Sequence, residues 1–183
     1  MPPASTQMAQ VEREALDHLF SATYEELRRL ASTLKRRDQS ATLSPTALVN
    51  EAWIKLAGSV GIASESHLHF KRIAARAMRQ LLVEAARRRN ANKRGGGGGV
   101  LLITFDESLH EAMTCGSDLL ALDAALEELA RMNPRQAMMV ESRFFGGLDI
   151  AETAALLEVS EATVLRDWRA AKAWLAHELR RSR

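Results

Sequence analysis

A dense block of basic residues, most of them arginines, is the clearest sign of a binding site in this sequence. Between residues 71 and 94 nine side chains are basic and Glu84 alone is acidic. At about 100° per residue, four of these arginines fall within roughly 80° of one another on a helix. They are Arg72, Arg76, Arg79 and Arg87. Few carboxylates are close in sequence, so we expect a polyphosphate backbone as their partner, with an affinity that falls as salt rises.

The last third of the chain has the spacing of a helix-turn-helix. Asp149 and Glu152 form a capping-box pattern that starts a short helix, and residues 158–159 form a tight turn. Ser160 then caps a longer helix over residues 161–180. In DNA-binding proteins of this kind the second helix enters the major groove. The pattern therefore predicts a second DNA-binding element.

Apolar spacing along that longer helix separates its core face from its outward face. The predicted core residues are Val164, Trp168, Ala171 and Leu175. The predicted DNA-contacting residues are Ser160, Glu161, Ala162, Thr163, Leu165, Arg166 and Arg169. Of these, Arg166 and Arg169 have the length and charge to reach guanine edges or phosphates. Glu158 stands where a turn usually has glycine, which predicts a strained backbone there.

The elements that must position these residues are helical, because the apolar period is helical and no alternating strand series appears. Ser44 with Pro45, Ser117 and Asn133 are helix-start signals. The predicted helices span residues 11–20, 24–34, 45–56, 69–89, 118–132, 134–145, 150–157 and 161–180. The single strand-like segment is residues 100–105.

Five consecutive glycines at residues 95–99 divide the chain, since they have no side chain to pack and great backbone freedom. We therefore expect an all-α protein of two small helical domains joined by a flexible Gly-rich linker, the C-terminal one a helix-turn-helix. The expected limits are residues 10–94, 95–116 and 117–183. A phosphate-binding glycine loop is disfavoured, because Lys93 and Arg94 precede the glycines and an apolar run follows them.

Composition limits the other classes of protein. The chain has 183 residues, 46% hydrophobic and 26% charged, which is typical of a globular protein and too short for a large multi-domain enzyme. Its longest apolar runs are about six residues, against roughly 20 for a membrane span. The first residues lack a secretory signal, so we expect a cytoplasmic protein without a membrane partner. The single cysteine, Cys115, is expected to be a free thiol.

Two rival functions compete with DNA binding by two linked modules. One is a helix-turn-helix transcription regulator whose N-terminal half senses a signal. The other is a metal- or nucleotide-dependent enzyme. His67 and His69, with His110 or Cys115, are a weak basis for a metal site, and no Ser/His/Asp set or carboxylate pair stands out. We therefore expect no enzyme activity, no metal, no cofactor and no small-molecule substrate.

The two halves together resemble a bacterial RNA polymerase sigma factor of the sigma-70 family, extracytoplasmic-function (ECF) type, from about residue 11 to 179. Residues 44–56, SPTALVNEAWIKL, are similar to the helix of that family that binds core polymerase. Residues 70–89 resemble its promoter −10 helix, and residues 133–175 resemble its −35-reading domain. The three blocks together are much more specific than any one of them.

The resemblance implies a non-catalytic subunit that binds core RNA polymerase and promoter DNA. The implied polymerase-docking surface is Leu48, Asn50, Glu51, Trp53 and Ile54. The implied −10 surface is Arg72, Arg76, Arg79, Gln80, Arg87, Arg88 and Arg89. The implied −35 surface is Ser160, Glu161, Ala162, Thr163, Leu165, Arg166 and Arg169. An anti-sigma factor is a further partner that the resemblance allows. The acidic stretch of residues 106–128 is expected to repel DNA.

Three departures from the family pattern concern these surfaces. Ser44, Thr46 and Ala47 are neutral where the family is usually acidic, which leaves Glu51 as the main charged docking contact. Ile73 stands where an aromatic is frequent, and Leu165 where a basic recognition residue is common. The promoter sequence, the inducing signal and the oligomeric state are left open by the sequence.

Overall fold

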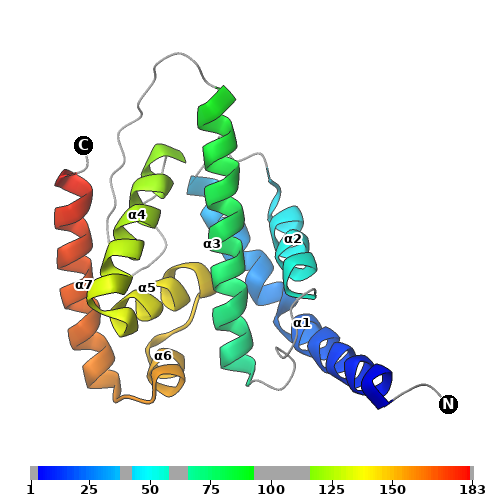
Figure 1. The fold of residues 1–183 in the computed structure, drawn as a ribbon. Helices are drawn as coiled ribbons and strands as arrows, with labels where there is room; N and C mark the ends of the chain where they lie inside the picture. Colours follow the sequence, from blue (N-terminus) through cyan, green and yellow to red (C-terminus); the bar gives the residue numbers. More distant parts are fainter. Residues whose placement is uncertain (1–3, 38–42, 58–65, 93–115, 182–183) are drawn as a thin grey trace.

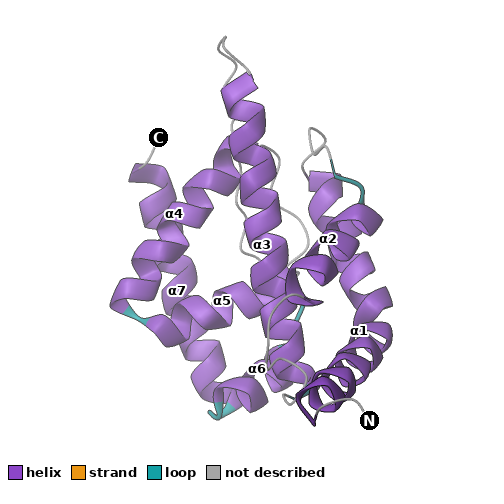
Figure 2. Ribbon diagram, turned by 45° about the vertical axis from the view of Figure 1, so that its right-hand side comes forward, coloured by secondary structure: helices purple, strands orange, loops and turns teal. Residues whose placement is uncertain are grey.

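The computed structural model describes residues 4–37, 43–57, 66–92 and 116–181 of the chain. This part of the chain forms seven α-helices and no strand, which confirms the all-α fold class (Figures 1 and 2). The helices are α1 (Ala4–Arg37), α2 (Pro45–Ala57), α3 (His67–Asn92), α4 (Gly116–Met132), α5 (Pro134–Gly146), α6 (Ile150–Leu157) and α7 (Glu161–Arg181).

Hydrogen bonds at the helix starts confirm most of the expected capping signals. The side-chain oxygens of Ser44, Asn133 and Ser160 each accept a backbone N–H three residues on, at 3.1, 3.1 and 3.2 Å. Asp149 and Glu152 form a reciprocal capping box at the start of α6. Each bond satisfies an N–H that the first turn of a helix leaves unpaired, so local sequence sets where these helices begin.

The helix bounds differ from the expectation in two places. Residues 11–20 and 24–34, expected as two helices, belong to the single α1. Thr23, near the expected break, is fully buried and donates its hydroxyl proton to a carbonyl one turn earlier, so its polar group is satisfied inside the helix. The start of α4 also differs from the expectation, because this helix begins at Gly116 and Ser117 lies inside it instead of capping it.

The central element is α3, with α2 on one side, the C-terminal helices on the other and α1 crossing behind it (Figure 1). Its residues in the core with α1 and α2 include Ala74, Ala77, Met78 and Leu81. A second set on α3 joins the core of α4, α5 and α7 instead. This set is Ala75, Val83 and Ala86. Both cores therefore include α3.

The end of α5 packs directly against α3. A Cβ atom placed on Gly146 would lie 3.0 Å from the Cβ of Ala75, so the lack of a side chain lets α5 reach α3. The half-buried Leu30 and Leu82 pack against both cores. The pentaglycine at residues 95–99 and the strand-like segment at 100–105 lie outside the described residues, and the domain limits drawn from them stay predictions.

Candidate nucleic-acid and polymerase interfaces

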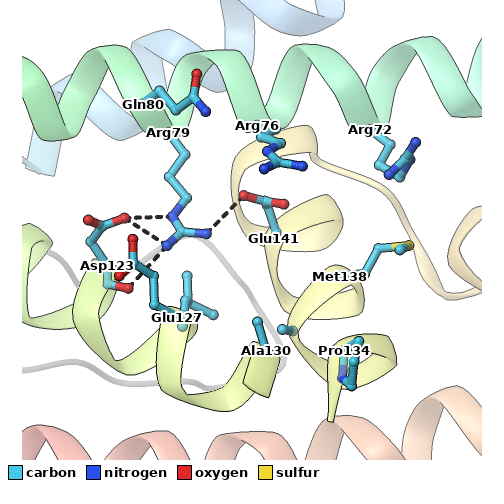
Figure 3. A pocket seen from close by; sticks show the side chains of 12 residues that line it. Arg72, Arg76, Arg79, Gln80, Asp123, Glu127, Ala130, Pro134, Met138 and Glu141 are labelled. Carbon is cyan, nitrogen blue, oxygen red and sulfur yellow. Dashed lines mark hydrogen bonds and ion pairs between the residues drawn. The ribbon is translucent and has the colours of Figure 1, made fainter. Parts of the chain in front are cut away.

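Arg79, in the middle of the predicted −10 surface, is paired with two carboxylates from the C-terminal half. Its Nε donates to Asp123 Oδ1 at 2.9 Å, and its Nη1 donates to Glu141 Oε1 at 3.0 Å (Figure 3). Its Nη2 donates to the Asp123 backbone carbonyl at 3.1 Å. Its side chain is 14% exposed. The expectation that these arginines lack carboxylate partners is therefore wrong for Arg79, because the partners come from distant helices.

The neighbours of Arg79 on α3 lie in more open positions. Arg72 is half-buried and contacts the His69 ring through Nη2, at 2.9 Å from Nε2, whereas Arg76 and Gln80 are exposed. Towards the end of the helix, Arg87 pairs with Asp123 Oδ2 at 3.3 Å while remaining 64% exposed. Arg88 is also exposed and pairs within the helix with Glu84 at 3.7 Å. The side chain of Arg89 lies outside the described residues.

A cavity of about 300 Å³ lies between α3 and the helices α4 and α5, beside the Arg79 ion pairs (Figure 3). One wall comprises Arg72, Arg76, Arg79 and Gln80. The facing wall includes Glu127, Pro134 and Met138. The predicted −10 surface thus borders a cleft that α3 shares with α4 and α5.

The predicted docking surface on α2 is partly exposed and partly core. Ile54 is 70% exposed, and Asn50 and Glu51 are also exposed. Trp53 is half-buried and stacks on Phe20 with ring centroids 4.4 Å apart. Leu48 is buried in the core with α1 and α3. The outward part of this surface is therefore Asn50, Glu51 and Ile54, while Leu48 supports the fold.

The turn between α6 and α7 has the strained geometry expected from the sequence. Glu158 has φ 54° and ψ 43°, in the left-handed region, and is the one residue other than glycine with positive φ in the described ranges. The N–H of Val159 donates to the Ala154 carbonyl at 3.0 Å, which closes the end of α6. Ala154 is buried, as a close approach of the two helices requires. The chain therefore turns sharply into α7 at this point.

The expected core face of α7 is confirmed, since Val164, Trp168, Ala171 and Leu175 are all buried. Trp168 acts as a core anchor, and the Arg143 guanidinium lies 4.4 Å from its ring centroid. Burial lowers the pKa of Arg143, and the negative charge of Asp149 acts in the opposite direction.

The predicted −35 surface is mostly outward. Thr163 and Leu165 are half-buried, and the other members are exposed. The exposed members are Ser160, Glu161, Ala162, Arg166 and Arg169. Arg166 is 72% exposed at its side chain. Its long side chain is thus available for a base edge or a phosphate.

Three further charged residues, none of which the sequence indicated, tie helices together. Asp123 holds Arg79, and Asp167 accepts a 2.6 Å bond from Arg135 that joins α7 to α5. Lys71 is 5% exposed and pairs with Glu152 of α6 at 2.8 Å. It also pairs with a carboxylate of α1. Their sequence signal is weak, because each partner is at least 32 residues away.

Lys71 is the buried charge that joins three helices. Burial by itself lowers the pKa of Lys71, but the hydrogen bonds and charges of Glu152 and Glu26 outweigh it. The pKa is therefore raised above the ordinary 10.5, and the ammonium stays charged at neutral pH. A charged lysine keeps α1, α3 and α6 paired, which ties the N-terminal half to α6.

The candidate metal ligands do not form a cluster in the described part of the chain. No group of three or more histidine, cysteine, aspartate or glutamate residues there has the geometry to hold an ion. His67 and His69 both lie on α3, and His110 and Cys115 fall outside the described residues.

A family model described as ECF sigma factor matches residues 5–181, almost the whole chain. No curated protein and no solved structure matches the chain significantly. None of the described helices is long and apolar enough to cross a bilayer. The matched range contains α2, α3 and α7, the three helices on which the predicted surfaces lie.

Proposed function

This chain belongs to the ECF sigma factor family of transcription initiation factors, and we propose that it docks on core RNA polymerase through α2 and reads promoters through α3 and α7. The observation that carries the proposal is the family match over residues 5–181, because all three surfaces lie within it. Sigma factors have no catalysis of their own, so each surface acts by binding.

The outward residues of α2 support the docking role. Ile54 is one of two large hydrophobic side chains that are exposed in the described ranges, and Glu51 beside it supplies a charge. An exposed aliphatic next to a carboxylate suits a protein interface, where apolar contact provides binding energy and charge provides orientation. We assign the polymerase contact to Asn50, Glu51 and Ile54.

The arginines of α3 support the −10 role. Their charges lie on one face, and arginine binds phosphate with two parallel hydrogen bonds. No aromatic residue occurs between Phe70 and Phe105, so a stacking platform for unpaired bases is missing from the sequence of this helix. Strand opening therefore depends on polymerase or on capture of a flipped base.

The exposed start of α7 supports the −35 role. In a helix-turn-helix the first turns of the second helix meet the base edges, and Ser160, Glu161 and Ala162 begin that helix here. Arg166 and Arg169 follow on the outward side. Helix α5 begins with Pro134 and Arg135, and the bond from Arg135 to Asp167 holds α7 against α5.

Run-off transcription with core polymerase and genomic fragments tests the proposal directly. We expect defined transcripts that require both the chain and core polymerase, and their start points identify the promoter. Footprinting by the chain without polymerase, together with failure to support transcription, would favour the regulator interpretation instead.

Substitution of Ile54 tests the docking surface, and substitution of Met132 provides a matched control. Ile54→Glu should abolish co-elution with core polymerase, because a charge replaces the exposed apolar contact. Met132→Glu changes the other large exposed hydrophobic, on α4, and should leave co-elution intact. Both sites are more than half exposed, so circular dichroism should report unchanged helix content. Equal binding by the two variants would place the polymerase contact elsewhere.

A further inference from the structure

We propose that Asp167 is a positioning residue for promoter reading: its buried carboxylate orients the Arg166 guanidinium, so that Arg166 meets a −35 base pair in one preferred geometry. This role rests on the proposed −35 function of α7. It assigns specificity to a residue that touches no DNA. It also selects Arg166, of the two outward arginines of α7, as the one that reads a base.

Asp167 lies at the edge of the core face of α7. At about 100° per residue it is about 60° from Val164 on the core side and about 100° from Arg166 on the outward side. Asp167 is 7% exposed, so its charge is largely removed from water. A buried carboxylate is costly unless a cation or N–H donors compensate it. The position therefore requires partners, and two arginines supply them.

The first partner, Arg135, fixes one side of the carboxylate. Arg135 lies in the first turn of α5 and donates from Nη2 to Asp167 Oδ2 at 2.6 Å. Charge-assisted bonds of this kind are among the stronger hydrogen bonds in proteins. Aspartate also has a short side chain with few rotamers. Burial and this bond therefore leave the second oxygen of Asp167 in a defined place.

The second oxygen of Asp167 faces Arg166. Its Oδ1 lies 3.6 Å from Arg166 Nε, which makes an ion pair but is too long for a hydrogen bond. Because the contact is at Nε, both terminal amino groups of the guanidinium stay available. Arginine can donate in parallel to O6 and N7 of guanine, the commonest specific contact in the major groove. The Arg166 side chain is 72% exposed and can extend towards such a base.

An arginine that is already oriented discriminates between bases better than an arginine that is not. A long side chain loses rotamer freedom when it binds, and a side chain held in the binding geometry loses less. Arg169, the next outward arginine, is exposed and has no ion pair or hydrogen bond among the residues that the structure describes. We therefore assign Arg169 to a phosphate, which accepts many approach directions, and Arg166 to a base.

Two substitutions break the Arg135–Asp167 bond from opposite sides. Asp167→Asn removes the carboxylate that faces Arg166, whereas Arg135→Gln keeps it. The measurement is binding of the chain, assembled with core polymerase, to promoter duplexes that carry single −35 changes. Arg166→Ala identifies the base position concerned. At this position Asp167→Asn should lower the discrimination between bases by about threefold, the effect of losing an exposed ion pair, and Arg135→Gln should retain it.

The comparison separates orientation from simple support of α7. Both substitutions weaken the tie between α5 and α7, so each should lower the urea midpoint measured by circular dichroism. A merely supporting Asp167 would make the two variants lose discrimination alike and at several −35 positions, and that result overturns the proposal. Parental discrimination in Asp167→Asn overturns it as well, and so does a uniform loss in Arg166→Ala. Absence of any −35 preference with the parent chain would instead count against the proposed function.

An exchange of the two partners is a second test. Arg135→Asp with Asp167→Arg keeps opposite charges between α5 and α7 but places a guanidinium beside Arg166. Like charges repel, so discrimination at the Arg166 position should fall at least as far as in Asp167→Asn. Full discrimination in the folded exchange variant overturns the proposal.

Arg169→Ala is the comparison for the assignment of the two arginines. Loss of a phosphate contact should weaken binding to every duplex alike and reduce the salt slope by about one. Loss of preference at one −35 position in Arg169→Ala, with a uniform loss in Arg166→Ala, would reverse the assignment and overturn the role of Asp167.

Discussion

Arg79 is half of a nearly buried ion pair, and this determines how its substitution must be interpreted. Removing one partner of such a pair leaves the other charge unpaired, which costs about 3–5 kcal/mol in well-buried cases, whereas the intact pair adds little net stability. Asp123 is 10% exposed and would keep Arg87 as its remaining partner. A loss of DNA binding in an Arg79 variant therefore mixes lost phosphate contact with an altered interface, while neutral replacement of the carboxylates keeps the DNA contact intact.

Glu158 provides a prediction at the scale of a single residue. A left-handed backbone costs an L-residue about 1–2 kcal/mol, and glycine avoids this but loses about 0.5–1 kcal/mol through its unfolded-state freedom. Glu158→Gly should therefore raise the free energy of unfolding by about 0.5–1 kcal/mol. Urea denaturation followed by circular dichroism measures it. Glu158→Ala keeps the Cβ atom and should show no such gain; an equal gain in both variants would mean that φ is not the cause.

At the scale of elements, α7 shows how one helix serves fold and function on separate faces. Its buried side packs into the C-terminal core and its outward side carries the proposed −35 surface. The faces can be separated because a helix turns about 100° per residue, so Val164 and Arg166 point apart. Changes on the outward side should leave folding intact and alter DNA binding alone.

Arg166→Ala tests this separation. Loss of a base contact should weaken promoter binding by the holoenzyme by about 1–3 kcal/mol and relax the preference at one −35 position. Arg180→Ala removes the same charge from an exposed site near the other end of α7 and is the matched control. Binding to promoter duplexes that carry single −35 changes gives the measurement. A uniform loss across all duplexes would identify Arg166 as a phosphate contact.

At the scale of the whole molecule, α3 makes the two halves interdependent. It contributes Ala74 and Met78 to one core and Val83 and Ala86 to the other, and Lys71 binds carboxylates from both halves. Loss of either core therefore exposes a face of α3 and weakens the other core. Two tethered and independent domains would lack this coupling.

The coupling predicts one cooperative unfolding transition. The chain has three tryptophans: Trp53 stacks on Phe20 in the first core, and Trp168 and Trp174 belong to the second. A Trp53→Phe variant reports the second core by fluorescence, and a variant with Trp168→Phe and Trp174→Phe reports the first. In each variant the urea midpoint measured by fluorescence should coincide with the midpoint measured by circular dichroism, which reports the helices of both halves. Two separated midpoints would show that the halves unfold independently.

The sequence alone determined most of the helices and their caps, the turn at Glu158 and the inward face of α7, because capping and apolar periodicity act within a few residues. It also carried the family resemblance that the match over residues 5–181 confirms. The face of α3 that packs on the C-terminal core comprises Ala75, Val83 and Ala86, which lie between arginines in the sequence. No neighbouring residue indicates that another helix packs on this face. Only the tertiary structure brought Asp123 and Glu141 to Arg79, from 44 and 62 residues away. Ion pairs over such separations depend on how helices pack, which no short spacing encodes.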